Sequence, residues 1–167
     1  MSRHVAKDSG YAVSIADGAG AVVIGPGGRD VIVDFVTDTD GSLCDATTMD
    51  HGSGGVAFTV AEASLRGVHD YGALRPPALV AELLRRNGVA PSDVALVAHQ
   101  ASRVLIEHWR SAIAPGEYIE TFDDHGNATV ASVPITLATR RDAITKPYLL
   151  LMSPGMGMHA VALLVRR

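Results

Sequence analysis

The stretch that most constrains the fold is a fully apolar run followed directly by a helical pattern. Residues 93–98, "DVALVA", show no alternation of polar and apolar side chains, which is typical of a strand buried on both faces. In the segment after it, residues 102–113, Leu105, Trp109 and Ile113 recur at spacings of four and so share one side of a helix. A buried strand that leads at once into an amphipathic helix predicts an α/β layered domain.

The remaining patterns supply further strands and helices for such layers. Alternating residues separated by "DG" and "GPGG" predict a three-stranded antiparallel start, and buried runs predict later strands. A loop is expected over 41–56, where turn-forming residues show no periodicity. We expect strands at 11–16, 19–24, 30–39, 117–122, 147–153 and 159–165, and helices at 56–70, 76–88 and 127–144.

Two helices contain proline. In the helix over 76–88, we expect Pro76 and Pro77 to occupy the first turn, where no backbone N–H is needed. Pro134 lies inside the helix over 127–144, so it should kink or delay that helix.

Composition indicates one globular domain over residues 1–167. The chain is 47% hydrophobic and 19% charged, without a repeat or a dividing linker. Fourteen scattered basic residues against eighteen acidic ones give a net charge of −4, which argues against nucleic acid as a partner. No run approaches the roughly 20 apolar residues of a membrane helix, and the first residues lack the apolar middle of a signal peptide. We therefore expect a cytoplasmic protein without a membrane partner.

Three features carry possible chemistry. His99 follows the buried strand at 93–98, and sites in α/β sheets lie beyond the carboxyl ends of strands. Asn127 precedes a helix rich in small residues, where an asparagine commonly serves as an N-cap. Residues 17–25, "DGAGAVVIG", contain closely spaced glycines but lead into a strand pattern, so a hairpin is favoured over a phosphate loop. Each feature alone has an ordinary structural explanation.

Four motifs in order identify a family. "DGAGAVVIG", "HQAS", "HGNATVASVP" and "SPGMGMHAVALLV" together resemble the C-terminal half of a β-ketoacyl-acyl-carrier-protein synthase III type condensing enzyme, in the thiolase superfamily. The resemblance implies a thiolase-like half: a five-stranded mixed sheet with helices on both faces. Full enzymes of this family stack two such halves around a tunnel for the pantetheine arm.

The resemblance also implies roles for particular residues. His99 Nε2 and the Asn127 amide would hydrogen-bond the thioester carbonyl of a malonyl-type extender and stabilise the enolate that forms as carbon dioxide leaves. A fixed donor of this kind lowers a barrier by roughly 2.7 to 4 kcal/mol. Gly155 and Gly157 correspond to a glycine-rich loop whose amide helps form an oxyanion hole, here altered to "PGMG".

Three further positions border the implied site. Ser102 stands where the family has asparagine, which puts a contact to the pantetheine arm in doubt. Arg103 comes one residue before the family's phosphate-holding basic residue, and Val104 occupies the expected place. Phe58, expected to open a helix, corresponds to an aromatic residue at the tunnel.

The family's cysteine nucleophile belongs to the N-terminal half, and Cys44 is the only cysteine here. One cysteine excludes a disulfide framework and a cysteine-based zinc site. Cys44 lies in a Gly/Ser/Asp-rich segment with no evident helix start to activate a thiolate. It is therefore a weak candidate nucleophile.

Three hypotheses follow. In the first, the chain is one subunit of a heterodimeric acyltransferase of fatty acid or polyketide synthesis, not competent alone, and a cysteine-bearing N-terminal-half ketosynthase-like subunit completes it. It would use acyl-CoA or acyl carrier protein thioesters without metal or other cofactor, for condensation or for acyl transfer to an alcohol or amine. In the second, it is a non-catalytic half that completes such a partner. The third is a metal-dependent hydrolase, whose candidate ligands have spacings that form no recognised set: His99, His108, His125 and Asp123 or Asp124.

Overall fold

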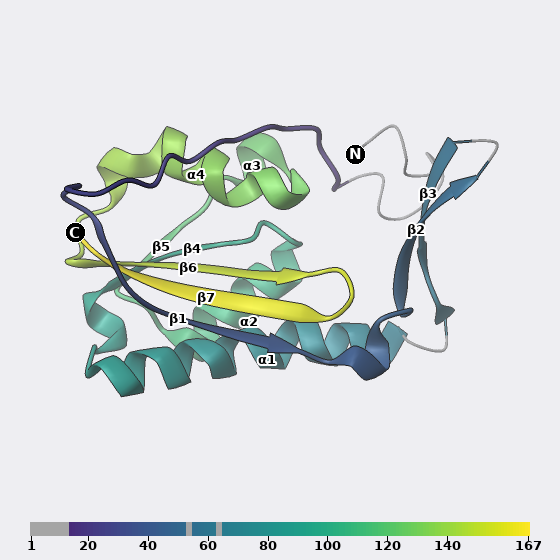
Figure 1. Cartoon of the computed structure of the whole chain (residues 1–167), viewed down its shortest axis with the longest axis horizontal. Helices are drawn as coiled ribbons and strands as arrows, with labels where there is room; N and C mark the ends of the chain where they lie inside the picture. The colour runs from purple at the N-terminus through teal and green to yellow at the C-terminus, as the bar shows by residue number, and fades with distance from the viewer. Residues whose placement is uncertain (1–13, 53–54, 63–64) are drawn as a thin grey trace.

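A five-stranded mixed sheet forms the centre of the molecule (Figure 1). The computed structural model describes residues 14–52, 55–62 and 65–167. The sheet has the order β1-β7-β6-β4-β5; β4 is parallel to β5 and β6, whereas β7 is antiparallel to β6 and β1. The strands are β1 (Val31–Thr39), β4 (Val94–Ala98), β5 (Glu117–Ile119), β6 (Tyr148–Gly155) and β7 (His159–Arg166).

Helices cover both faces of this sheet (Figure 1). On one face lie α1 (Leu65–Asn87) and α2 (Arg103–Ile113), and on the other lie α3 (Phe122–His125) and α4 (Ser132–Arg140). Short 3-10 turns complete the described chain at Gly41–Leu43, Pro91–Asp93, Thr129–Ala131 and Arg141–Ala143. The thiolase-like half inferred from the sequence motifs is therefore confirmed as an architecture.

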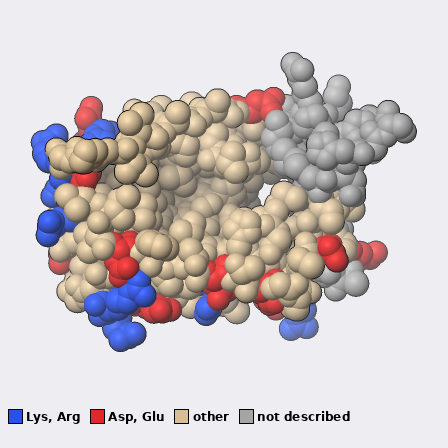
Figure 2. All heavy atoms as spheres, viewed as in Figure 1, with Lys and Arg blue, Asp and Glu red and all other residues tan. Residues whose placement is uncertain are grey.

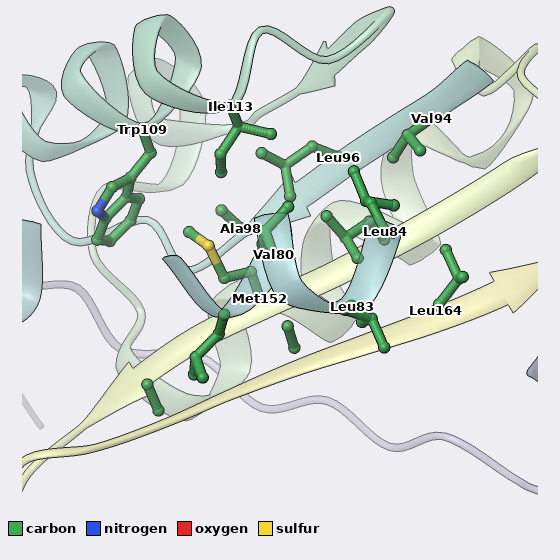
Figure 3. Packing of buried hydrophobic residues seen from close by; sticks show 14 residues of the cluster. Val80, Leu83, Leu84, Val94, Leu96, Ala98, Trp109, Ile113, Met152 and Leu164 are labelled. Carbon is green, nitrogen blue, oxygen red and sulfur yellow. The ribbon is translucent and has the colours of Figure 1, made fainter. Parts of the chain in front are cut away.

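The larger core lies between the sheet and α1 and α2 (Figure 3). All five residues of β4 are fully buried, as the unbroken apolar run predicts. Trp109 of α2 is also fully buried, and its indole N–H donates to the Gly72 carbonyl of α1 at 2.9 Å. Each fully buried large side chain contributes about 1.5–3 kcal/mol, so this layer holds β4 and its carboxyl end in place.

The predicted three-stranded start is wrong for the described residues. Only the strand over 30–39 forms, as β1, and it pairs with β7. Residues 11–13 of the first expected strand lie outside the described part, and Ile15 makes an isolated bridge to Asn127. Residues 19–24 belong to no strand, because β1 takes its ladder partner from the other end of the chain.

The predicted loop over 41–56 is also wrong. β2 (Thr47–Gly52) and β3 (Gly55–Val60) form an antiparallel hairpin separate from the main sheet. Phe58 therefore lies in a strand opposite Met49 and does not open a helix. β-branched residues in "GVAFTV" favour a strand, and the described part of the next helix spans Leu65–Asn87.

Pro76 and Pro77 occupy other helix positions than expected, whereas Pro134 does not. Pro76 and Pro77 lie inside the continuous helix α1 instead of its first turn, and Pro76 packs into the core. Burial offsets the lost backbone hydrogen bond there. Pro134 is the third residue of α4, whose start is delayed to Ser132 as expected. At that position the missing N–H leaves no helical bond unmade.

Candidate functional site

His99 is the first residue after β4, at the carboxyl end of the parallel strands. Its backbone N–H donates to the Met152 carbonyl of β6 at 2.8 Å, which ties the turn to the neighbouring strand. Burial lowers the pKa of the imidazole to about 4, and a hydrogen bond with the backbone of Thr129 partly opposes this shift. At neutral pH the ring is therefore uncharged, with one donor nitrogen and one acceptor nitrogen.

Asn127 follows α3, and its side chain has two partners. The amide Nδ2 donates to the Ala101 carbonyl at 3.1 Å, and Oδ1 accepts from the Thr129 N–H at 2.9 Å. These two bonds define the orientation of the amide, since a flipped group would satisfy neither.

The backbone of Asn127 is held on both sides by the segment at Ser14. Its N–H donates to the Ser14 carbonyl at 2.7 Å, and its carbonyl accepts from the Ala16 N–H at 2.9 Å. Gly126 permits this approach: its φ is 60°, and a Cβ there would lie 2.9 Å from the Ser14 oxygen. Residues far apart in the sequence thus clamp the asparagine.

His99 and Asn127 meet through the same backbone groups. Both contact the backbone of Thr129, and Asn127 also contacts the 99–101 turn through Ala101. The two residues that the motifs single out therefore lie in one cluster at the carboxyl end of the sheet. Around them the side-chain donors are neutral, which suits an oxygen that gains negative charge during a reaction.

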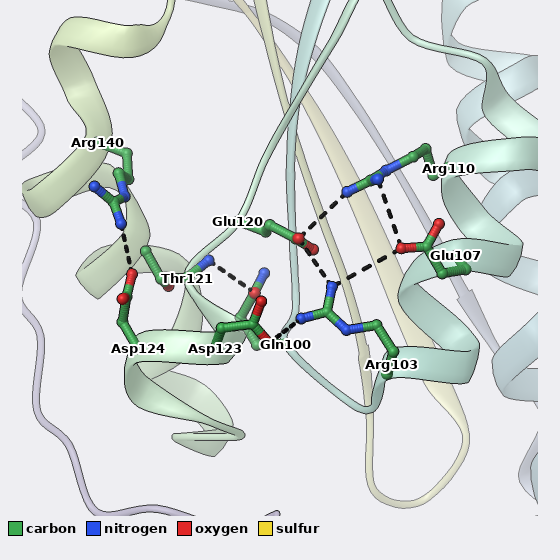
Figure 4. Close-up of polar contacts among 9 residues, drawn as sticks. All are labelled: Gln100, Arg103, Glu107, Arg110, Glu120, Thr121, Asp123, Asp124 and Arg140. Atoms are coloured by element: carbon green, nitrogen blue, oxygen red, sulfur yellow. Dashed lines mark hydrogen bonds and ion pairs between the residues drawn. The ribbon is translucent and has the colours of Figure 1, made fainter.

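A buried polar chain supports this cluster, and sequence reasoning missed it (Figure 4). Gln100 is 1% exposed; its Nε2 donates to the Ala98 carbonyl at 2.7 Å and its Oε1 accepts from the Thr121 N–H at 3.1 Å. The Thr121 hydroxyl lies 2.7 Å from that of Thr136, which donates to the Ser132 carbonyl at 2.9 Å. The only sequence signal for these hydrogen bonds was the amide of Gln100, which directly follows His99 at the end of a buried strand.

Arg103 is engaged by carboxylates (Figure 4). It donates to Glu120 at 2.9 Å and to Asp123, and its guanidinium lies 5.1 Å from the centre of the Phe122 ring. Arg110 joins the same group, 3.3 Å from Glu120. The positive charge that the sequence suggests for phosphate is balanced here by acidic neighbours.

The other sequence-derived positions have local structural roles. The Ser102 hydroxyl caps α2 by accepting from the Leu105 N–H at 3.3 Å. Gly155 ends β6 opposite His159, and a Cβ on it would lie 2.2 Å from His159 Nε2, so the ring covers this glycine. Gly157 has φ 75° in the β6–β7 turn. Phe58 lies on the β2–β3 hairpin, and its side chain falls outside the described part.

The third hypothesis lacks a metal site in the part of the chain that the structure describes. No group of three histidine, cysteine, aspartate or glutamate side chains there could hold a metal ion. Cys44 is exposed at the end of a 3-10 turn. Over the same residues, no helix is long and apolar enough to cross a membrane.

Comparisons with known proteins identify the family of this chain. Residues 84–167 match the family described as 3-oxoacyl-[acyl-carrier-protein (ACP)] synthase III C terminal. A β-ketoacyl-[acyl-carrier-protein] synthase III of Rhodospirillum centenum is 33% identical over 75% of this chain and 42% of its own length. One from Acidiphilium cryptum is 31% identical over 96% of this chain and 53% of its own length.

Solved structures show the same fold. The 3-oxoacyl-(acyl carrier protein) synthase III of Pseudomonas aeruginosa superposes with a TM-score of 0.69 at 22% identity, covering 81% of this chain and 44% of that one. The corresponding Aquifex aeolicus protein gives 0.68 at 20% identity, over 84% and 46%. The chain thus spans about half the length of the relatives that it matches.

Proposed function

The chain belongs to the 3-oxoacyl-[acyl-carrier-protein] synthase III family, and from this premise we propose that it supplies His99 and Asn127 to a two-subunit condensing enzyme. A second, ketosynthase-like subunit carries the cysteine nucleophile. The observation that carries the proposal is the joining of a neutral, mostly buried His99 and an oriented Asn127 amide through Thr129. A chain that only completed a partner's fold would need neither group.

The proposed reaction is decarboxylative condensation. The carbon–carbon bond to the extender's carboxylate breaks, carbon dioxide leaves, and the bonding electrons pass to the thioester oxygen as an enolate. Asn127 Nδ2 donates to that oxygen, and the His99 ring donates to it in the tautomer whose single N–H faces the substrate instead of the Thr129 backbone. The enolate carbon then attacks the acyl thioester on the partner's cysteine, and the cysteine thiolate leaves as the new carbon–carbon bond is made.

An extended segment over residues 17–25 supports the subunit proposal. Val22, Val23 and Ile24 on it are 64%, 96% and 76% exposed, although their sequence favours a strand. Gly18 and Gly20 let its other side approach Ile135 and Pro134 of α4 closely. Exposed apolar side chains on an extended segment suit the addition of a partner's strand.

The adjoining surface is also uncharged. Phe35 of β1 and Val161 of β7 are 59% and 37% exposed. Figure 2 shows a hollowed central area of uncharged residues on this side of the molecule, with the charged side chains around its margin. Large exposed apolar surfaces of this kind mark protein interfaces.

For the substrate we propose a pantetheine thioester, of CoA or of acyl carrier protein, in the cytoplasm and in fatty acid or polyketide synthesis. The names of the similar proteins, which are synthases acting with acyl carrier protein, support this choice. No further cofactor or metal is proposed, since the two neutral donors act on the oxygen directly.

The test is co-expression with cysteine-bearing ketosynthase-like subunits, followed by native mass measurement and incubation with acyl-CoA and malonyl thioester. We expect a heteromeric complex in which the partner's cysteine gains the acyl mass and carbon dioxide is released. Val23→Lys should weaken the complex, whereas Leu74→Lys, a matched change at an exposed α1 residue, should not.

Two results would contradict the proposal. A condensing activity of this chain alone would remove the need for a partner. A complex that transfers acyl groups to an alcohol or amine, without carbon dioxide release and without dependence on Asn127, would replace condensation by simple acyl transfer.

A further inference from the structure

Thr129 has an unusual backbone conformation. Among the described residues, three that are not glycine have positive φ: Ala114, Thr129 and Met158. Ala114 ends α2 as a left-handed cap with its N–H on the Arg110 carbonyl, and Met158 lies in the β6–β7 turn beside Gly157. Thr129, at φ 53°, is β-branched and in neither kind of position. For such a residue the left-handed region is a strained outlier that points to a functional constraint.

The strained residue joins the two groups of the site. Its N–H donates to Asn127 Oδ1 at 2.9 Å, and its backbone hydrogen-bonds with the His99 ring. Together with ψ, the torsion φ sets the direction of a residue's carbonyl relative to its N–H. A change from 53° to the ordinary right-handed value, near −60°, would turn these groups apart, so both contacts could not be kept.

Packing on either side holds the conformation in place. Ala128 before it is 2% exposed; after it, Val130 is 93% exposed, whereas Ala131 and Ser132 are 3% and 2% exposed. Relaxation of the Thr129 turn would therefore move buried residues on both sides of it, including Ser132, the first residue of α4. This is how a strained residue persists in a folded chain.

We propose that Thr129 is a positioning residue whose left-handed backbone orients the Asn127 amide and the His99 ring toward one substrate oxygen. With Oδ1 on the Thr129 N–H and one Nδ2 hydrogen on the Ala101 carbonyl, the second Nδ2 hydrogen stays available to that oxygen. The catalytic meaning rests on the proposed function, but the orientation itself is a property of this chain alone.

The test compares Thr129→Pro with Thr129→Asn in the full chain by NMR. Proline removes the N–H and forbids positive φ, whereas asparagine accepts the left-handed region. We expect Thr129→Pro to shift the Asn127 NH₂ signals and to lower the His99 pKa further, because the hydrogen bond with the Thr129 backbone is the contact that opposes the effect of burial. Thr129→Asn should leave the Asn127 signals and the His99 pKa unchanged. A purely destabilising effect of substitution at this position would not distinguish the two variants in this way.

Two further variants keep the test decisive. Ala114→Asn changes another left-handed residue, at the C-terminal end of α2, and should leave the His99 and Asn127 signals unchanged. If Thr129→Pro does not fold, Asn127→Ala replaces it: the Thr129 amide should then exchange with solvent roughly tenfold faster, and the His99 tautomer signals should shift.

The inference is overturned if a folded Thr129→Pro variant keeps the His99 pKa and the Asn127 signals, or if Asn127→Ala leaves Thr129 exchange unchanged. It is also overturned if Thr129→Val alone reproduces the proline effect, since the hydroxyl would then be responsible. In the complex, Thr129→Pro should lower kcat with little change in KM. Absence of any condensing activity in the wild-type complex, with the NMR results as expected, would reject the proposed function and leave this inference standing.

Discussion

Two polar clusters flank the start of α2, and they are built on opposite principles. The neutral cluster (His99, Gln100, Thr121 and Asn127) contains no formal charge at neutral pH and includes fully buried groups. The ionic cluster (Arg103, Glu107, Arg110, Glu120 and Asp123) joins charged side chains at the surface. The boundary between the two clusters falls between two consecutive residues. Glu120 bonds Arg103 in the ionic cluster, whereas Thr121 bonds Gln100 in the neutral cluster (Figure 4).

The difference favours the neutral cluster as the place for the proposed chemistry. In the ionic cluster the charges are already compensated, and exposed ion pairs contribute about 0–1 kcal/mol each. In the neutral cluster, donors are fixed in a buried setting where each bond has a larger effect. We therefore expect substitutions in the neutral cluster to affect both reaction and stability, and substitutions in the ionic cluster to affect neither strongly.

The largest effect is expected from Asn127→Ala in the reconstituted complex. Loss of one donor to the enolate oxygen should lower the rate of carbon dioxide release by about 10²–10³-fold. The measurement is malonyl thioester decarboxylation at saturating substrate. Asn87→Ala, whose side chain bonds Asp34 away from the site, is the control and should retain the rate. An unchanged rate in Asn127→Ala would move the reacting centre elsewhere.

The next effect concerns pH. The unfolded chain takes up a proton at His99 below its ordinary pKa of 6.5, whereas the folded chain does so only near 4. The free energy of unfolding should therefore fall as pH drops from 6.5 to 4, by up to about 3 kcal/mol from this group. Urea titrations at several pH values should show a shallower dependence for His99→Gln. His108→Gln, at an exposed position, should behave as wild type.

Gln100→Leu should have a smaller effect, on stability. It leaves the Thr121 N–H and the Ala98 carbonyl without their buried partners, at a cost of about 1–3 kcal/mol. Thermal or urea unfolding measures the loss. Thr139→Val removes an exposed hydrogen bond within α4 and should change stability by less than about 0.5 kcal/mol. Equal losses of stability in the two variants would mean that burial does not strengthen the hydrogen bonds of the neutral cluster.

The smallest effect is expected from Arg103→Gln. Its partners are partly exposed, so the free energy of unfolding should fall by less than about 1 kcal/mol, and less still at high salt. Arg140→Gln, which removes a single exposed ion pair with Asp124, is the matched comparison. A loss of CoA or carrier-protein binding in Arg103→Gln alone would contradict its purely local role.

Parts of the fold followed directly from local pattern. The apolar run at 93–98 became the fully buried β4, and the spacing of Trp109 and Ile113 predicted α2. Residues 147–153 and 159–165 became β6 and β7. The strand pattern over 19–24 did not form a strand, because strand formation needs a ladder partner and propensity does not provide one. The prediction of a loop over 41–56 was wrong for the opposite reason: the two strands of the hairpin there provide each other with a ladder partner.

For the site, the sequence by itself determined which residues to consider: the motifs singled out His99 and Asn127, and the buried strand placed His99 at the carboxyl end of a strand. Only the tertiary structure brought the two together, through Thr129, Ala101 and the segment at Ser14. It also decided that Arg103 faces carboxylates and that Gln100 braces the turn. The physical reason is that backbone hydrogen bonds between distant segments, and the burial that shifts the pKa of His99, depend on packing that no local pattern records.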